Sequence, residues 1–279
     1  MADSIAEIAG LPKKFGALPG YGGPGVVRYP WTVPALAAAP TRGWCCQCVD
    51  EDGADAWPEA LAPYILREPE WTVWRHIPNA AAQRRWMRGR VAAKDAVRLL
   101  LRDRFGVMAT LEAIGVLPGA CGQPRVACGG LPATGVGILV SISHSGKSSV
   151  ALAAERSEVC RGVGIDVVSL DDHHDGLAEG GFAATETALL DDCPLPERHD
   201  WLLRLWCAKE AVGKALGVGL RGDPLTLVVR QVDRARGTVE VEPNDFRESD
   251  GAMRSPAQVT ARVGSDRGMA FAVACLEER

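Results

Sequence analysis

Hydrophobic side chains recur at helical spacing in AAAQRRWMRGRVAAKDAVRLLLRDRF, which covers residues 80–105. Trp86, Val91, Val97 and Leu100 belong to this apolar stripe, and charged residues occupy the opposite positions. Asn79 directly precedes the segment and has a side chain suited to an N-cap. The pattern therefore predicts a helix over residues 79–105. The next segment, GVLPGACGQPRVACGGLPATG at 115–135, is rich in Gly and Pro and is interpreted as a loop.

Three apolar runs of strand length follow this loop. Residues 136–143 (VGILVSIS) and 147–155 (KSSVALAAE) are separated only by a short turn, and residues 161–168 (RGVGIDVV) come next. A connection this short allows only antiparallel pairing of the first two strands.

The second half of the chain repeats this order of elements. A helical stretch over residues 180–216 is interrupted at DDCPLPE, and strands are expected at 224–231, 238–243, 257–263 and 269–276. Helix followed by antiparallel sheet thus occurs twice, although no strong residue-level repeat is visible. The order predicts an α+β fold of two similar halves, each a small antiparallel sheet with a packed helix, and a site between the halves.

The expected organisation has three parts. Residues 1–65, with prolines at 12, 19, 24, 30, 34 and 40, are interpreted as a Pro/Gly-rich N-terminal arm or linker. Residues 66–162 form the first half and residues 163–279 the second.

Composition limits the possible classes of protein. Of the 279 residues, 47% are hydrophobic and 24% charged, which is ordinary for a globular chain and excludes a disordered or collagen-like one. No apolar run of about 18 residues predicts a membrane span, and the N-terminus lacks the features of a secretory signal. We therefore expect a cytoplasmic protein whose nine cysteines are thiols, with neither a membrane nor a nucleic-acid partner.

The net charge of −4 is unevenly distributed. From Arg75 to Arg104, nine Lys or Arg residues face only two Asp residues, a local excess of positive charge. Such a run forms either a solvated helix face or a site for polyanions such as phosphates, and charge density alone favours neither interpretation.

Three segments carry candidate chemistry. Ser143, His144 and Ser145 lie at a strand end, where they form either a polar hairpin or a cluster of donors for an anion. Asp166 lies in an apolar strand, so its carboxylate must be paired, protonated or metal-bound. Glu210 and Lys214 continue a helical row that begins with apolar residues. They form either a surface ion pair or, with Asp166, a site for a hard cation or a general base.

Other motifs are weaker. Gly146-Lys147-Ser148 resembles half of a phosphate-binding loop, but a strand follows it where a helix is required; a P-loop nucleotidase is the least favoured hypothesis. The G-x-G-x-x-G match at 217–222 follows a helix and precedes a strand, the reverse of the dinucleotide-binding order. Cys45, Cys46 and Cys48 lack a second pair of ligands for zinc.

Together, Ser143-His144-Ser145, Gly164-Ile165-Asp166 and the segment WCAKEAVGK at 206–214 resemble, in this order, the signature of the 4′-phosphopantetheinyl transferase superfamily. The resemblance covers roughly residues 75–275. The length and doubled layout are similar to the surfactin-synthetase type, a monomer of two halves related by pseudo-twofold symmetry.

The resemblance implies a magnesium-dependent enzyme. It would transfer the 4′-phosphopantetheine arm of coenzyme A to a serine of an acyl or peptidyl carrier protein and release adenosine 3′,5′-bisphosphate. Asp166 and Glu210 would hold Mg²⁺, Glu210 would deprotonate the carrier serine, and Lys214 would neutralise charge on the phosphates. Val168 stands where many relatives carry a further metal-binding Glu, so Mn²⁺ is an alternative metal.

The resemblance also implies contacts with coenzyme A. Ser143 and His144 would contact its phosphates, and Arg90 and Lys94 match positions where relatives carry phosphate-binding cations. The family's Gly-Lys-Pro segment reads Gly-Gln-Pro at residues 122–124, and Arg125 is expected to supply the missing cation.

The expected partners are coenzyme A and a carrier protein, and the chain is expected to act as a monomer or as a domain of a multienzyme. Fatty acid, polyketide and peptide carriers all remain open. The alternative function is a non-catalytic module that binds coenzyme A or a carrier within a larger synthase.

Overall fold

The structure is a computed structural model of the 279-residue chain. It describes residues 26–31, 43–50, 62–119, 122–128, 137–157, 160–172, 176–220, 223–244 and 258–277.

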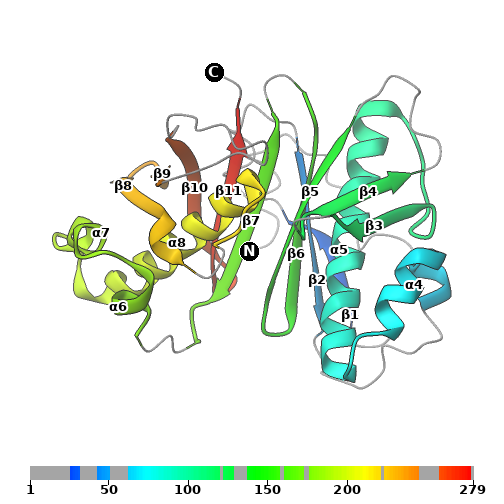
Figure 1. Ribbon diagram of the computed structural model, residues 1–279, viewed down its shortest axis with the longest axis horizontal. Helices are drawn as coiled ribbons and strands as arrows, with labels where there is room; N and C mark the ends of the chain where they lie inside the picture. The colour runs from blue at the N-terminus through cyan, green and yellow to red at the C-terminus, as the bar shows by residue number, and fades with distance from the viewer. Residues whose placement is uncertain are drawn as a thin grey trace.

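The first half is built on a six-stranded antiparallel sheet. Its strands are β1 (Val26–Pro30), β2 (Gly43–Asp50), β3 (Ile114–Pro118), β4 (Pro124–Cys128), β5 (Ile138–Ser145) and β6 (Ser148–Glu155), in the order β1-β2-β6-β5-β4-β3. The long helix α5 (Ala80–Phe105) packs on one face of this sheet (Figure 1). Two short helices, α3 (Ala62–Ile65) and α4 (Glu68–Arg75), precede it.

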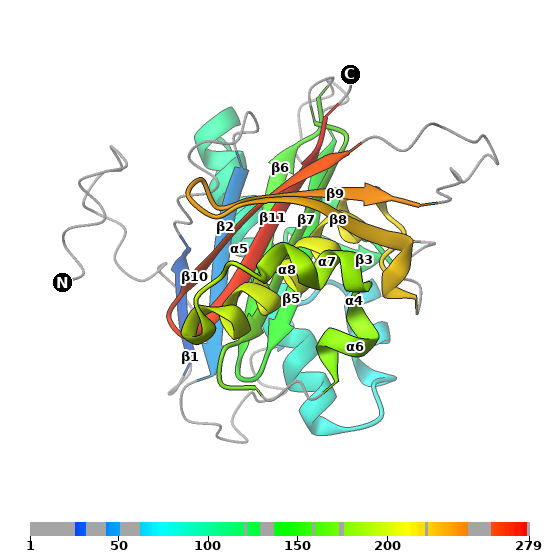
Figure 2. The same ribbon diagram turned by 90° about the vertical axis from the view of Figure 1, so that its left-hand side faces the viewer.

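The second half is built on a five-stranded antiparallel sheet. Its strands are β7 (Gly162–Ser169), β8 (Leu227–Asp233), β9 (Thr238–Pro243), β10 (Val259–Asp266) and β11 (Met269–Leu276), in the order β7-β11-β10-β9-β8. The long helix α8 (Leu195–Leu216) crosses its outer face, preceded by α6 (Leu177–Gly181), α7 (Ala184–Thr187) and η1 (Ala188–Leu190) (Figure 2). The short helix η2 (Pro224–Thr226) leads into β8.

The two halves have the same topology. In the first, β2 precedes α5, and the strands after the helix lie in the order β3-β4-β5-β6 with β2 beside β6. In the second, β7 precedes α8, and the following strands lie in the order β8-β9-β10-β11 with β7 beside β11. The predicted α+β fold of two similar halves is therefore confirmed.

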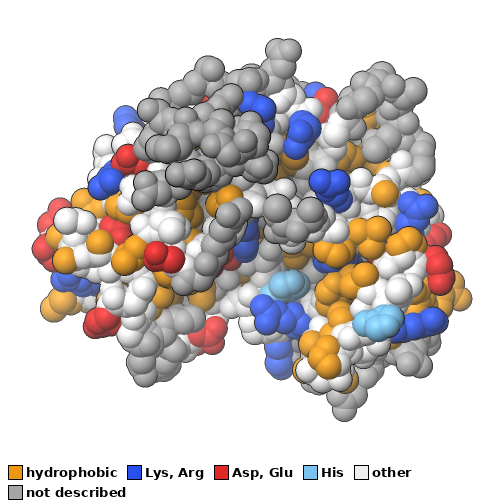
Figure 3. Space-filling view, in the orientation of Figure 1, with side chains coloured by type: hydrophobic (Ala, Val, Ile, Leu, Met, Phe, Trp, Pro, Cys, Tyr) orange, Lys and Arg blue, Asp and Glu red, His pale blue; other side chains and the backbone are white. Residues whose placement is uncertain are grey.

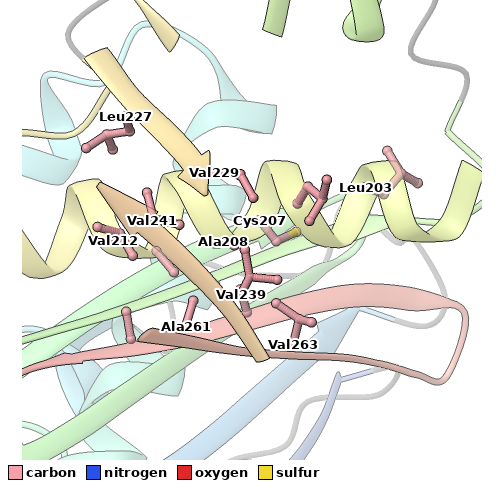
Figure 4. Packing of buried hydrophobic residues seen from close by; sticks show 14 of the residues in the cluster. Leu203, Cys207, Ala208, Val212, Leu227, Val229, Val239, Val241, Ala261 and Val263 are labelled. Atoms are coloured by element: carbon pink, nitrogen blue, oxygen red, sulfur yellow. The ribbon is translucent and has the colours of Figure 1, made fainter. Parts of the chain in front are cut away.

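The structure has four layers, which are α5, the first sheet, the second sheet and α8, and a hydrophobic cluster lies between each layer and the next. One lies between α5 and the first sheet, one between the two sheets, and one between the second sheet and α8. In the last cluster, Leu203, Cys207 and Val212 of α8 face Val239 and Val241 of the sheet (Figure 4). Side chains on β7 alternate between two of these clusters, so this strand is buried on both faces.

Most predicted elements are confirmed. The helix expected over residues 79–105 is α5, with the Asn79 side chain accepting a hydrogen bond from the backbone N–H of Ala82 (2.8 Å). The strands expected at 136–143 and 147–155 are β5 and β6, and they pair antiparallel. The interruption expected at DDCPLPE, residues 191–197, is present only as far as Pro194, because α8 begins at Leu195. The four strands expected in the second half are β8 to β11.

Two predictions from Pro and Gly content are wrong. Residues 115–135 were expected to form a loop, but β3 and β4 pair as an antiparallel hairpin around Gly119 and Gln123. Residues 1–65 were expected to form an irregular arm, but β2 pairs along its length with β6, and β1 extends the sheet. The first sheet thus begins before residue 66. The rest of the arm, residues 1–25, 32–42 and 51–61, lies outside the described residues.

A buried ion pair ties the elements of the first half together. The ammonium of Lys94 on α5 lies 2.6 Å from the Glu70 carboxylate of α4, and neither side chain is exposed to solvent. Lys94 also donates to the backbone carbonyl of Ile65. Glu70 accepts hydrogen bonds from the backbone N–H groups of Arg67 (2.8 Å) and of Val116 on β3 (3.0 Å). All of these groups are satisfied, as buried polar atoms require.

The second half contains the same arrangement. Lys209 on α8 lies 3.0 Å from the carboxylate of Glu186 on α7, and its ammonium donates to the carbonyl of Gly181 (2.8 Å). Glu186 accepts from the backbone N–H groups of Ala183 (2.8 Å) and of Val229 on β8 (2.9 Å). In each half, the pair therefore joins a short helix, the long helix and the first strand that follows it.

This equivalence reveals a repeat that inspection of the sequence missed. Residues 93–97 read AKDAV and residues 208–212 read AKEAV, and the two lysines are the equivalent buried cations. Five residues are too few to stand out in 279 until the structure aligns the two helices. The sequence similarity between the two halves thus includes the lysine of each buried ion pair.

Candidate active site

The two halves meet where β5 of the first lies beside β7 of the second (Figure 1). Serine side chains take the place of strand pairing there. The hydroxyl of Ser141 accepts from the backbone N–H of Ile165 (3.1 Å), and that of Ser145 accepts from Ser169 (2.8 Å). Ser143, between them, lies 3.4 Å from the N–H of Val167. Ser141 was not predicted as a site residue, and Ser145 was named only as a donor for an anion, although the period-two spacing of the three serines is visible in the sequence.

Asp166 is the acidic centre of this junction. Its side chain points from β7 toward α8 and is mostly buried. Ser143 donates to its Oδ1 atom (2.7 Å), and the Lys214 ammonium from α8 lies 2.7 Å from the same oxygen. Lys214 also donates to the backbone carbonyl of Ile165 (3.0 Å). The structure thus brings together Ser143, Asp166 and Lys214, three residues that the sequence analysis selected from three separate segments.

Glycines on β7 bring α8 close enough for these contacts. A Cβ atom at Gly164 would lie 1.7 Å from the backbone oxygen of Ala211, and one at Gly162 would lie 2.2 Å from that of Ala215. No side chain fits in these gaps, so only glycine allows the helix backbone to rest directly on the strand.

Glu210 lies half-buried one helical turn before Lys214. Burial raises the pKa of its carboxyl above the ordinary value, the negative charge of Asp166 raises it further, and Lys214 partly opposes both effects. Among the described residues, Lys214 forms its ion pair with Asp166 and not with Glu210. The simple i,i+4 surface pair considered from the sequence is therefore not the arrangement present, and the Glu210 carboxylate remains available.

Cys207 lies beneath these carboxylates. Its thiol is fully buried and contacts the carbonyl oxygen of Ala270 (3.7 Å). Burial raises its pKa well above the ordinary value, and the neighbouring Asp166 adds to the effect. The thiol is therefore neutral, so Cys207 contributes packing at the base of the site and no nucleophile.

His144 follows Ser143 on β5, and Lys214 of the Asp166–Lys214 pair is one of the cations that act on its ring. Its ring contacts α5 at Gly89, where a Cβ atom would come within 2.5 Å of the ring. Burial, followed by the positive charges of Arg85, Lys214 and Arg88, lowers the pKa of His144 to about 3. A neutral imidazole surrounded by cations is suited to an anionic ligand. Figure 3 shows a histidine beside Lys and Arg side chains in the hollow between the halves.

Comparison with known proteins identifies the family. The sequence model of the 4′-phosphopantetheinyl transferase superfamily matches residues 162–261, which include Asp166, Glu210 and Lys214. A holo-[acyl-carrier-protein] synthase of Wolinella succinogenes is 30% identical over 122 residues, which are 98% of that protein and 42% of this chain. The chain belongs to the 4′-phosphopantetheinyl transferase superfamily.

Two solved structures are also similar to part of this transferase. The holo-[acyl-carrier-protein] synthase of Neisseria meningitidis aligns at 20% identity with a TM-score of 0.31, over 36% of this chain and 83% of its own. That of Thermotoga maritima aligns at 18% identity with a TM-score of 0.29, over 46% of this chain and 69% of its own.

Only the second half of the transferase carries the full set of Asp166, Glu210 and Lys214. By strand register and the AKDAV repeat, the positions of the first half that correspond to Asp166, Glu210 and Lys214 hold Cys46, Asp95 and Leu99. Asp95 is buried and lies 3.3 Å from Arg98 on its own helix. The first half therefore lacks an equivalent of the Asp166–Lys214 ion pair, and it faces the site with cations.

The carboxylates of the transferase fit a divalent cation. The negative charge of Asp166 raises the pKa of Glu210, and a cation held between two such carboxylates relieves this repulsion. Across the described part of the chain, no three His, Cys, Asp or Glu side chains converge to form a complete metal site. Mg²⁺ commonly binds through one or two carboxylates, with water and substrate phosphates as its other ligands, which is the donor set available here.

The cations predicted to bind coenzyme A fall into different environments. Arg90 is mostly buried, its guanidinium lies over the Trp86 ring (4.2 Å to the ring centroid), and burial lowers its pKa to about 10. Its Nε has no hydrogen-bond partner among the described groups. The expectation for Lys94 is wrong, because its ammonium is fully buried and bonded to Glu70 and Ile65. Lys94 therefore stabilises the fold and does not face the site.

Arg125 is exposed on β4, and no described contact joins it to the carboxylates. The adjacent Gln123 does approach the site region, since a Cβ atom at Gly217, just after α8, would lie 2.2 Å from its side chain. Arg85 and Arg88 were not selected individually from the sequence. The excess of positive charge between Arg75 and Arg104 was the signal for both.

The weaker motifs have structural roles. Gly146 and Lys147 form the tight turn between β5 and β6, so no helix follows them as a phosphate-binding loop requires. Cys45 points to the core between the sheets, whereas Cys46 and Cys48 point to the core under α5. The three thiols thus lie on opposite faces of β2 and cannot share a zinc ion. Arg221 and Gly222 lie outside the described residues.

No helix in the described ranges is both long and apolar enough to cross a membrane.

Proposed function

We propose that this protein transfers the 4′-phosphopantetheine arm of coenzyme A to a serine hydroxyl of a carrier protein. The observation that carries the proposal is the junction of the halves, where Asp166, Glu210 and Lys214 come together and Lys214 is also one of the cations around a neutral His144. The serine oxygen attacks the phosphorus of the phosphopantetheine, the bond to the bridging oxygen breaks, and adenosine 3′,5′-bisphosphate leaves.

The carboxylates and Lys214 have complementary roles. Glu210 accepts the proton of the carrier serine, because its raised pKa makes it a stronger base than an exposed carboxylate. Bound Mg²⁺, or Mn²⁺, would be held by Asp166 and Glu210 and would neutralise the pyrophosphate. Lys214, fixed by Asp166 and the Ile165 carbonyl, presents its charge to the leaving phosphate. Phosphoryl transfer depends mainly on such positioning and charge neutralisation.

The first half supplies the binding surface for coenzyme A. Ser143 and His144 contact its phosphates, and Arg85, Arg88 and Arg90 of α5 provide the positive field. Arg125 is proposed as an additional cation at the edge of the site. Because one chain contains both halves, we propose that it acts as a monomer of the surfactin-synthetase type or as a domain of a multienzyme.

The carrier partner follows from the same charges. The related protein of Wolinella succinogenes is named as a holo-[acyl-carrier-protein] synthase, which supports an acyl or peptidyl carrier as the substrate here. The basic helix α5 also suits a partner with an acidic surface.

The test is the mass of the carrier. Incubation with coenzyme A, Mg²⁺ and a panel of apo-carriers should add one phosphopantetheine arm to at least one of them, and chelation of the metal should prevent this. If every carrier stays unmodified while a control transferase modifies it, the proposal is wrong. Binding of coenzyme A without transfer would then favour the alternative, a non-catalytic binding module.

A further inference from the structure

His144 makes one hydrogen bond that the chemistry above does not use. On the hairpin of β5 and β6, His144 lies directly opposite Ser149, and the ring Nδ1 is 2.7 Å from the Ser149 hydroxyl oxygen. Ser149 is completely buried. The register of the two strands fixes this contact, so it does not depend on a flexible loop.

The burial of the Ser149 hydroxyl decides which group donates in this hydrogen bond. Among the described residues, Nδ1 of His144 is the one atom that bonds the Ser149 hydroxyl. If the ring donated to Ser149, the serine proton would be buried without an acceptor, at a cost of about 1–3 kcal/mol. If Ser149 donates to Nδ1, both groups are satisfied. The ring proton of a neutral imidazole must then lie on Nε2.

The cations around the ring keep it neutral, as a single ring proton on Nε2 requires. Arg85, Arg88 and Arg90 from α5 and Lys214 from α8 all lower the pKa of His144, so the ring is neutral at physiological pH. No described side chain bonds Nε2, which is also not fully enclosed. Nε2 is thus the ring nitrogen that a ligand can reach. The four cations attract an anionic ligand, and an oxygen of that ligand can accept a hydrogen bond from Nε2 only if Nε2 carries the ring proton.

We propose that Ser149 is a positioning residue: its hydroxyl donates to Nδ1 of His144 and thereby holds the ring as a neutral Nε2–H donor for a phosphate oxygen of the substrate. Gly89 supports this geometry, because a Cβ atom on it would lie 3.0 Å from Nε2 and would displace the ring. The identification of the ligand as coenzyme A rests on the proposed function, whereas the assignment of the tautomer does not.

The tautomer can be measured without substrate. In ¹⁵N-histidine-labelled protein, long-range ¹H–¹⁵N correlation spectra distinguish the two neutral tautomers and the imidazolium. The chain has five histidines, so His144→Gln identifies the relevant signals. We expect His144 to be protonated on Nε2 alone from pH 5 to 8. Protonation on Nδ1, or an imidazolium at pH 7, would overturn the proposal.

The effect on substrate is tested by Ser149→Ala. Loss of the fixed donor should raise the KM for coenzyme A roughly tenfold and leave kcat nearly unchanged. Ser149→Thr, which keeps the hydroxyl, should restore the KM. In a His144→Gln background, Ser149→Ala should have no further effect on KM, because Ser149 acts through the ring. Equal effects of Ser149→Ala in both backgrounds would show that it does not.

Ser148→Ala is the matched control. Ser148 is the preceding residue of β6, is also buried, and accepts a hydrogen bond from the Gln47 amide instead of the ring. We expect Ser148→Ala to lower thermal stability while leaving the His144 tautomer and the KM unchanged.

If no carrier is modified even by the unaltered protein, the proposed function fails, but the spectra still decide the tautomer. In that case, calorimetric titration with adenosine 3′,5′-bisphosphate replaces KM as the readout, and the same pattern among the variants is expected. Equal affinity of the unaltered and Ser149→Ala proteins would overturn the positioning role.

Discussion

Lys209 lies in the same motif as Glu210, but the structure predicts that its loss affects folding and not chemistry. Its ammonium is fully buried between the Glu186 carboxylate and the Gly181 carbonyl, and it lies 4.8 Å from the centroid of the Phe182 ring. Lys209→Met has a similar length and keeps the packing. It leaves Glu186 as a buried carboxylate with only backbone N–H donors, and loss of one partner of a buried pair costs about 3–5 kcal/mol.

Urea unfolding followed by circular dichroism measures this loss directly. We expect the free energy of unfolding of Lys209→Met to fall by about 3–5 kcal/mol, while kcat at low temperature stays within a few-fold of the unaltered protein. Arg198→Met is the matched control on the same helix, because Arg198 pairs with Asp191 (2.9 Å) on the surface. Its loss should cost no more than about 1 kcal/mol.

The first half offers an independent repetition. Lys94→Met removes the equivalent cation from Glu70 and should destabilise the protein by a similar amount. If either variant unfolds within about 1 kcal/mol of the unaltered protein, the reasoning from burial is wrong. If Lys209→Met keeps its stability but loses transfer activity, Lys209 acts in the chemistry instead.

Three further predictions concern the site. Glu210→Gln should abolish carrier modification without unfolding the chain, as shown by mass spectrometry and circular dichroism, whereas the exposed Glu197→Gln on the same helix should retain activity. Gly164→Ala should lower Tm strongly because its Cβ would lie 1.7 Å from a carbonyl oxygen of α8, whereas Gly180→Ala, with open space around it, should not. The pKa of His144 is lowered to about 3, so between this pH and 6.5 the imidazole is protonated in the unfolded chain but neutral in the folded protein. Stability should therefore fall with decreasing pH, by about 2 kcal/mol at pH 5, and His144→Gln should remove this part of the slope in urea titrations at each pH.

The long elements could be predicted because their side chains repeat with a clear period. The apolar spacing and N-cap of α5, and the short turn between β5 and β6, are local properties of consecutive residues. The hairpin of β3 and β4 could not be predicted in this way. Its glycines and prolines are typical of loops, and β3 is held by contacts that form only in the folded chain, among them the hydrogen bond from Val116 to Glu70.

Residue types and order determined the catalytic candidates. Ser143, Asp166 and Lys214 were selected from motifs, and the structure places Ser143 and Lys214 both within hydrogen-bonding distance of Asp166. The sequence did not separate Lys94 from Arg90, because both belong to one basic helix. Only the tertiary structure shows that one cation faces Glu70 in the core and that the other lies over Trp86.

The sequence by itself thus determined the two helix-and-sheet halves and the set of chemical groups, because periodicity and residue type are local. The tertiary structure decided which groups meet. Glycines on β7 let α8 approach and bring Lys214 to Asp166. A strand register places Ser149 opposite His144, and two similar buried pairs show which lysines are structural. These depend on distances between segments that lie far apart in the chain, which a linear pattern does not contain.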